Sequence, residues 1–279
     1  MIRRRFPSLV AVVLIACGGS AGESDSTVSS TGPAELVITA RDFAFEMPDT
    51  VPAGLTHIRL LNQGPQLHHA QLIRFAEGRS LADMEAHLKS GATSVPSWME
   101  EVGGPNPPEV GMETSTTQML EPGNYAVVCF VDLPDRVPHV MKGMAMPFVV
   151  VPSTAAAAPE PTPTVSMTLN DYAFGLSAPL TAGHHVVRVD NGAAQAHEVA
   201  VLQLKPGKTL EDFTKFGETY QGEMPATSVG GIAGIKGGSH AWFEVDLTPG
   251  DYLLVCFVLD ATDGKPHLMH GMLQPFSIS

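Results

Sequence analysis

The sequence predicts an all-β fold, built as two β-sandwich or barrel domains in tandem, each with one short inserted helix. Three observations support this. Proline (23) and glycine (27) are abundant among 279 residues, while charged residues make up only 16%, a balance typical of short strands joined by turns. Short apolar segments recur between turn-forming residues. The second half of the chain also repeats the first at an offset of about 128 residues.

The repeat is clearest at matched turns. Asp42-Phe43-Ala44-Phe45 corresponds to Asp171-Tyr172-Ala173-Phe174, and Pro122-Gly123-Asn124-Tyr125 corresponds to Pro249-Gly250-Asp251-Tyr252. Each unit has the size of an ordinary domain. The chain is therefore divided into a signal peptide at 1–17, a flexible tether at 18–34, a first domain at 35–151, a linker rich in proline and alanine at 152–164, and a second domain at 165–279.

Strands are expected where apolar residues follow turn residues. The segments 125–131 and 252–258 are apolar throughout, as in strands covered on both faces. Ser80 and Thr209 each precede an aspartate by three residues, a capping-box pattern that predicts one helix per unit. Such spacing favours a Greek-key sandwich or barrel. The other expected strands are 36–40, 55–61 and 147–151 in the first unit, and 165–169, 185–189 and 275–278 in the second.

The N-terminus has the pattern of a secretory signal. Three arginines precede a short apolar run that is too short for a stable membrane span. The run ends in Leu14-Ile15-Ala16-Cys17, which resembles the bacterial lipobox, in which the cysteine becomes the lipid-carrying mature N-terminus. We therefore expect lipidation at Cys17 and a lipid-anchored protein of the cell envelope, facing the periplasm or the cell exterior. An ordinary secretory signal with an incidental cysteine is the alternative.

Copper-type donors recur in both units. A thiolate, an imidazole and a thioether are ligands that suit copper. In order, these candidate ligands are Cys129, His139 and Met144 in the first unit, and Cys256, His267 and Met272 in the second. Each unit also has a matched histidine about 60 residues upstream of its cysteine, His68 or His197. Met141 and Met269 compete for the thioether role, and His270 is a candidate auxiliary ligand in the second unit only.

In the order His, Cys, His, Met, each unit resembles a cupredoxin, the blue-copper β-sandwich family. The resemblance implies up to two copper ions per chain, held by the residues named above, and one-electron transfer or copper handling with a redox partner protein. One feature departs from the family. The loop between the cysteine and the second histidine, which is usually only a few residues long, covers residues 130–138 and 257–266 here.

Other interpretations remain open at this point. A cysteine on an apolar strand is often a small core residue, so a metal-free binding or scaffold module is the main alternative, and Cys129 could pair with Cys256 in an oxidising compartment. A two-domain copper oxidase or nitrite reductase needs further histidines, as His-x-His and His-Cys-His, and neither pattern occurs. We therefore expect an electron carrier or binding protein rather than an enzyme. The net charge of −13 disfavours nucleic acid as a partner.

Overall fold

A computed structural model describes residues 32–91, 95–132 and 135–279. The predicted signal peptide, Cys17 and most of the tether lie outside the described residues. The described residues belong to one compact unit, in which the strands form two sheets accompanied by two short α-helices. The all-β prediction is therefore confirmed.

The first sheet has eight strands and takes four from each half of the chain. Its order is β11 (Ala173–Leu176), β10 (Val165–Asn170), β12 (Gly183–Asn191), β15 (His240–Leu247), β7 (Glu113–Leu120), β4 (Gly54–Asn62), β1 (Ala34–Arg41) and β2 (Ala44–Glu46). β4 and β7 are antiparallel neighbours, as are their counterparts β12 and β15. β1 pairs in parallel with β4, and β10 pairs in parallel with β12.

The second sheet has nine strands and also crosses between the halves. Its order is β17 (Leu273–Ile278), β16 (Gly250–Val255), β13 (His197–Leu204), β14 (Ala226–Ile235), β6 (Met99–Gly103), β5 (Gln71–Phe75), β8 (Gly123–Val128), β9 (Ala145–Val151) and β3 (Thr50–Pro52). Apart from β3, every strand of the first half has a counterpart in the second half.

The two halves share both sheets. In the first sheet β15 pairs with β7 over three residues, and in the second sheet β14 pairs with β6 where Ile235 lies opposite Val102. Residues 152–164, the predicted linker, contain no helix or strand and are mostly exposed. Each half thus contributes strands to both layers, and the prediction that the halves are separate domains stays a prediction.

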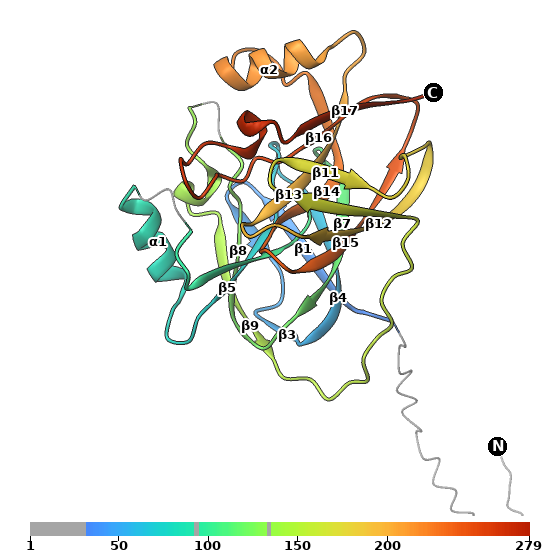
Figure 1. The fold of residues 1–279 in the computed structure, drawn as a ribbon. Helices are drawn as coiled ribbons and strands as arrows, with labels where there is room; N and C mark the ends of the chain where they lie inside the picture. The colour runs from blue at the N-terminus through green and yellow to red at the C-terminus, as the bar shows by residue number, and fades with distance from the viewer. Residues whose placement is uncertain (1–31, 92–94, 133–134) are drawn as a thin grey trace, which may run out of the picture. The chain divides into compact units, whose positions relative to one another are not determined.

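The helices begin where the capping-box pattern indicates. α1 (Leu81–Lys89) starts after Ser80 and α2 (Leu210–Thr219) starts after Thr209. In each, the aspartate three residues later accepts a hydrogen bond from the backbone N–H of the capping residue, 2.9 Å long in both cases. Both helices lie at the periphery of the strands (Figure 1).

Strand β8 is buried on both faces. Tyr125 and Val127 point into the core between the sheets, where Cys129 also packs, while Ala126 and Val128 pack with the α1 side of the molecule. β16 is arranged in the same way, with Tyr252, Leu254 and Cys256 in the core of the second half. This alternation explains why both segments are apolar throughout, and it directs each cysteine between the two sheets.

In each half, one glycine lies against the backbone segment that follows the upstream histidine. Gly104 (φ 119°) and Gly231 (φ 115°) lie against the carbonyl oxygens of Ala70 and Val199, where a Cβ would overlap the oxygen. Ala70 and Val199 each follow a predicted histidine ligand by two residues. Only glycine allows this close approach at these dihedral angles.

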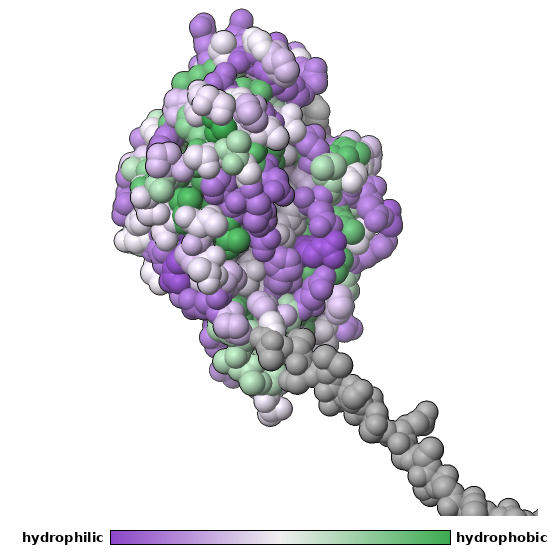
Figure 2. Space-filling model, turned by 90° about the vertical axis from the view of Figure 1, so that its right-hand side faces the viewer, coloured by the Kyte–Doolittle hydropathy of each residue, from purple (hydrophilic) through white to green (hydrophobic). Residues whose placement is uncertain are grey.

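The surface is mixed in character. On the face seen in Figure 2, hydrophilic residues are widespread and hydrophobic residues occur in small groups. Among the described residues, neither helix has the length and hydropathy needed to cross a lipid bilayer.

Candidate metal centre

The first group of candidate ligands lies at one end of the second sheet. β5 and β8 are antiparallel, with Gln71 opposite Val128, so the residues just before β5 and just after β8 lie at the same end. His68 and Cys129 occupy these positions. His139, the first residue of a short 3₁₀ helix (His139–Lys142), completes the group. The His139 Nδ1 atom lies 3.0 Å from His68 Nδ1 and 3.4 Å from Cys129 Sγ.

The second group forms in the same way. β13 and β16 are antiparallel, with Ala200 opposite Val255, which places His197 and Cys256 at one end of the sheet. His267 begins a second 3₁₀ helix (His267–His270). Cys256 Sγ lies 3.4 Å from His267 Nδ1 and 3.9 Å from His197 Nδ1.

Both groups are enclosed and compact. All six side chains are fully buried, and within each group one donor atom per residue lies within 4.8 Å of the others. Both cysteines are free, so the alternative of a disulfide between them is not realised. Two imidazole nitrogens and one sulfur facing a common point fit a transition-metal ion of the kind that imidazole and thiolate bind.

The long loops return their histidines to the cysteines through backbone hydrogen bonds. In the first half, Val140 N–H donates to the Cys129 carbonyl (2.8 Å), and Cys129 N–H donates to the Met144 carbonyl (3.2 Å). A β-bridge between Asp132 and Pro138 closes the base of the loop. The base of the loop is therefore tightly held.

The second half has the same hydrogen bonds. Leu268 N–H donates to the Cys256 carbonyl (2.9 Å), and Cys256 N–H donates to the Met272 carbonyl (3.1 Å). Here the bridge joins Leu259 and Pro266. Because one arrangement occurs twice in loops of different sequence, the backbone around the cysteine, and not the loop composition, positions the second histidine.

The methionines divide into two classes. Met144 and Met272 are fully buried and belong to the same core clusters as Cys129 and Cys256. Met141 and Met269, the competing candidates, are 43% and 66% exposed. Burial next to the cysteine favours the first pair for the thioether role, and that assignment stays a prediction.

An aspartate orients the upstream histidine of each group. Asp42 Oδ1 lies 2.7 Å from His68 Nε2, and Asp171 Oδ1 lies 2.9 Å from His197 Nε2. A carboxylate next to Nε2 keeps the proton on that nitrogen. Nδ1, which faces the cysteine, is then unprotonated and can bind a metal ion. Carboxylates commonly orient metal-binding histidines in this way. Sequence reasoning treated these aspartates only as markers of the repeat.

The residue after each aspartate covers the other histidine. The Phe43 ring meets His139 edge to face at 5.3 Å, and the Tyr172 ring meets His267 at 5.4 Å. Phe43 and Tyr172 both have positive φ angles, 21° and 63°, which are uncommon for residues other than glycine. The turn after β1 and the turn after β10 therefore each act on both histidines of one group.

The residue after the upstream histidine binds the backbone beside the cysteine. His69 Nε2 accepts from Phe130 N–H and Glu198 Oε1 accepts from Phe257 N–H, both at 2.8 Å. Burial lowers the pKa of His69 to about 3 and raises the pKa of Glu198 to about 7. His69 thus shares a structural role with Glu198.

Burial sets the protonation of the donors themselves. It raises the pKa of the Cys129 thiol to about 12 and raises the pKa of the Cys256 thiol further. It lowers the pKa of His139, and lowers the pKa of His267 to about 4. Burial thus favours the protonated thiols when no metal ion is bound, and a metal ion that binds must displace the thiol proton.

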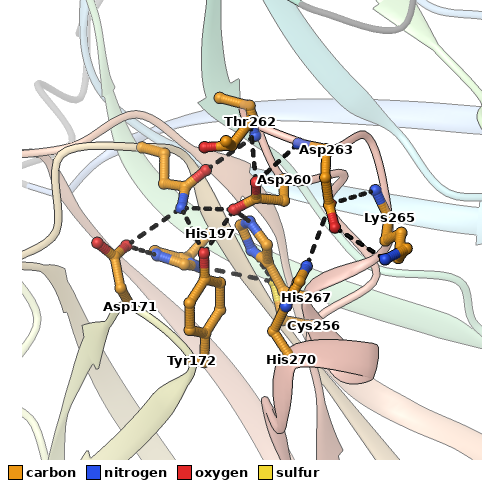
Figure 3. A network of polar contacts seen from close by, with 12 residues as sticks. Asp171, Tyr172, His197, Cys256, Asp260, Thr262, Asp263, Lys265, His267 and His270 are labelled. Carbon is orange, nitrogen blue, oxygen red and sulfur yellow. Dashed lines mark hydrogen bonds and ion pairs between the residues drawn. The ribbon is translucent and has the colours of Figure 1, made fainter.

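The predicted auxiliary ligand His270 lies at the outer edge of the polar network around the second group (Figure 3). His270 Nε2 lies 3.2 Å from Asp263 Oδ1, and Lys265 Nζ lies 3.1 Å from Asp263 Oδ2. Asp260, Asp263 and His270 form a third cluster of potential donors, but a lysine ammonium already occupies one side of it. This cluster closes the loop of the second half, and His270 contacts no member of the second His/Cys/His group among the contacts described.

Comparisons with known proteins show remote structural similarity. No protein-family model and no curated protein matches the chain. Auracyanin A, a "blue" copper protein from Chloroflexus aurantiacus, is 20% identical over 44% of this chain and 100% of its own, with a TM-score of 0.30.

The blue copper oxidase from Nitrosomonas europaea is 15% identical over 88% of this chain and 86% of its own, with a TM-score of 0.25. The copper-containing nitrite reductase from Thermus scotoductus SA-01 is 12% identical over 89% of this chain and 62% of its own, also with a TM-score of 0.25. At these identities and TM-scores we base no functional conclusion on the similarity.

Proposed function

We propose that each His/Cys/His group binds one copper ion and that the protein is a two-centre one-electron carrier. The observation that supports this most strongly is the convergence of two Nδ1 atoms and one Sγ atom in a buried space, found once in each half. Two imidazoles and one thiolate in a plane, with a weak axial thioether, are the donors of electron-transfer copper sites. Met144 and Met272 are the proposed thioether ligands.

The surrounding residues suit electron transfer. Copper in such a site supplies a couple between Cu(II) and Cu(I). The protein's part is to hold the donors in one geometry for both states: Asp42 and Asp171 orient the upstream histidines, and backbone hydrogen bonds hold the loop histidines. Burial excludes water from the donors. A rigid, dry donor set of this kind undergoes little rearrangement when one electron arrives or leaves.

We also propose that the carrier is lipid-anchored at the cell envelope through Cys17 and exchanges electrons with a redox partner protein. The lipobox-like sequence supports the anchor. The acidic net charge of −13 disfavours nucleic acid as a partner. Replacing Cys17 with serine should move the protein from the membrane fraction to the soluble fraction. Retention of the variant in the membrane fraction would contradict the lipid anchor.

Copper reconstitution tests the proposal. Protein beginning at about residue 30 is treated with Cu(II), freed of excess metal, and analysed for copper content and visible absorption. We expect two copper ions per chain and an intense thiolate-to-copper band, both abolished in the Cys129→Ser/Cys256→Ser variant. A folded, colourless wild-type protein without copper would favour the metal-free binding module instead.

A further inference from the structure

The two groups differ most at the loop histidine. In the first half His139 Nε2 lies 3.2 Å from Gln66 Oε1, a hydrogen bond to a neutral amide. In the second half His267 Nε2 is buried and has no hydrogen-bond partner. The atom facing it is Asp260 Oδ2, at 3.8 Å. The second histidine thus faces a carboxylate where the first faces an amide.

The matched glutamines of the two halves make different contacts, and Asp260 accounts for the difference. Gln195 corresponds to Gln66, but its Nε2 donates to Asp260 Oδ2 (3.0 Å) and its Oε1 accepts from Ala261 N–H (3.1 Å). The Tyr172 hydroxyl donates to the same carboxylate oxygen at 2.6 Å, a bond that Phe43 cannot make in the first half. Figure 3 shows the carboxylate of Asp260 between Tyr172 and the loop.

The hydrogen bonds keep Asp260 ionised although it is buried. Its Oδ1 accepts from the backbone N–H groups of Thr262 and Asp263, at 2.8 and 3.2 Å. With Tyr172 and Gln195, four donors stabilise the charged form. The residue is only 4% exposed, so salt screens its charge less than it would screen a surface carboxylate.

The first half has no equivalent charge in the part of the chain that the structure describes. Asp132, an acidic residue of its loop, lies 3.4 Å from the hydroxyl of Tyr220, the residue after α2. Among the described residues no hydrogen bond or ion pair joins Asp132 to His139. Each half has one aspartate at its upstream histidine, Asp42 or Asp171, so these two charges do not contribute to the difference between the centres. Glu198, which replaces His69, differs as well, so an experiment must change Asp260 alone.

We propose that Asp260 sets the second copper centre at a lower reduction potential than the first. The inference rests on the proposed copper binding. A fixed negative charge stabilises Cu(II) more than Cu(I), because the oxidised ion carries one more positive charge. One electron from a donor protein converts Cu(II) to Cu(I) without making or breaking a covalent bond, and in a half-reduced chain that electron resides mainly on the first centre.

Redox titration of single-centre variants tests this. Cys256→Ser retains the first centre and Cys129→Ser retains the second, and the thiolate-to-copper band reports the oxidised fraction of each. We expect the Cu(II)/Cu(I) ratio at a given potential to be at least tenfold higher in the second centre, or ~59 mV for a one-electron couple. Asp260→Asn should remove most of that difference while the potential of the first centre is unchanged.

Tyr172→Phe provides a variant with the opposite expected effect. It removes one donor from Asp260 and makes the turn match Phe43 of the first half, so the less neutralised negative charge should lower the second potential further. A role for these residues in folding alone would not produce shifts of opposite sign. Circular dichroism and copper content establish that each variant is folded and loaded.

The outcomes separate the two proposals. If both centres bind copper but Asp260→Asn leaves the second potential unchanged, or if the second centre has the higher potential, the inference is wrong and the carrier function stands. If neither centre binds copper, the proposed function is overturned and the inference with it.

Discussion

The two halves of the molecule keep the same donor geometry and differ in the charges around it. Both have an aspartate at the upstream histidine, an aromatic ring over the loop histidine, and the same backbone hydrogen bonds around the cysteine. The differences lie in residues next to the candidate ligands. Glu198 replaces His69, and Asp260 faces His267 where the Gln66 amide faces His139. A repeated site can therefore diverge in electrostatics while its geometry is retained.

The largest loss of folding stability should come from replacing the glycine that each half places against a backbone carbonyl. Gly104→Ala and Gly231→Ala each place a Cβ against a carbonyl oxygen at a positive φ, and each should lower the free energy of unfolding by roughly 3–4 kcal/mol. Gly111 is the control, because it has a φ of 79° and a Cβ added there would meet no atom within 4 Å.

Gly111→Ala should cost only about 1 kcal/mol. Chemical denaturation of the three variants measures these differences. A loss at Gly104 or Gly231 no larger than that at Gly111 would show that the close approach of the backbone is not required.

The next largest effect on stability concerns Glu101, a carboxyl of the second sheet at a position where the second half has a serine. Glu101 lies opposite Ile73 and Ser228 opposite Leu202, so these two residues occupy matched positions. Burial raises the pKa of Glu101 to about 7 from an ordinary value near 4.5. The folded state therefore holds a proton that the unfolded state releases, and the stability from that proton is present below pH 4.5 and lost as the pH rises through 7.

A shift of one pKa unit corresponds to about 1.36 kcal/mol. The free energy of unfolding should therefore fall by at most about 3 kcal/mol between about pH 4.5 and pH 8 because of Glu101. Glu101→Gln should remove this contribution, while that of Glu198, whose pKa burial also raises to about 7, remains. Ser228→Ala should leave the pH dependence unchanged. Urea denaturation at several pH values measures both. An unaltered pH dependence in Glu101→Gln would contradict the assigned role of this carboxyl.

Replacing either of the two matched aspartates should weaken copper binding to a similar extent. Asp42→Asn and Asp171→Asn each remove the carboxylate from the Nε2 of one upstream histidine, and each should weaken copper binding in its own half by about 10- to 100-fold. Competition with a copper chelator in the single-cysteine backgrounds measures each affinity. A loss in one half only would show that the two halves do not share this mode of orienting the histidine.

The smallest effects are expected at the loop surface. Lys142 and His270 occupy matched positions and contact Asp135 and Asp263 at 3.9 and 3.2 Å. Lys142→Ala and His270→Ala should change the free energy of unfolding by no more than about 0.5 kcal/mol, as for other exposed ion pairs. Copper content should also be unchanged, whereas loss of copper in His270→Ala would support its assignment as an auxiliary ligand.

Much of the fold could be predicted from local sequence. Capping boxes at Ser80 and Thr209 located both helices, and apolar segments after Ala-Gly and Pro-Gly turns located β4, β8 and their counterparts. Strands β5, β6 and β7 were not predicted. β6 contains two glutamates and β7 is rich in threonine, so their place in the sheets depends on pairing with distant strands, including strands of the other half.

The candidate site was predictable in its donors and not in its surroundings. The order of His68, Cys129 and His139 identified residues that the structure brings together. The repeated Asp-aromatic pair at Asp42 and Asp171 was a visible signal for the histidine partners, but its role requires knowing that the turn folds over the site. The return of the long loops depends on backbone hydrogen bonds that no side-chain pattern records.

Diffraction from copper-loaded crystals, with anomalous data collected at the copper absorption edge, tests the central claim most directly. We predict two anomalous peaks per chain, one bonded to the Nδ1 atoms of His68 and His139 and Sγ of Cys129, and one bonded to the corresponding atoms of His197, His267 and Cys256. Copper found only elsewhere, for example among Asp260, Asp263 and His270, or no bound copper at all, would contradict the account.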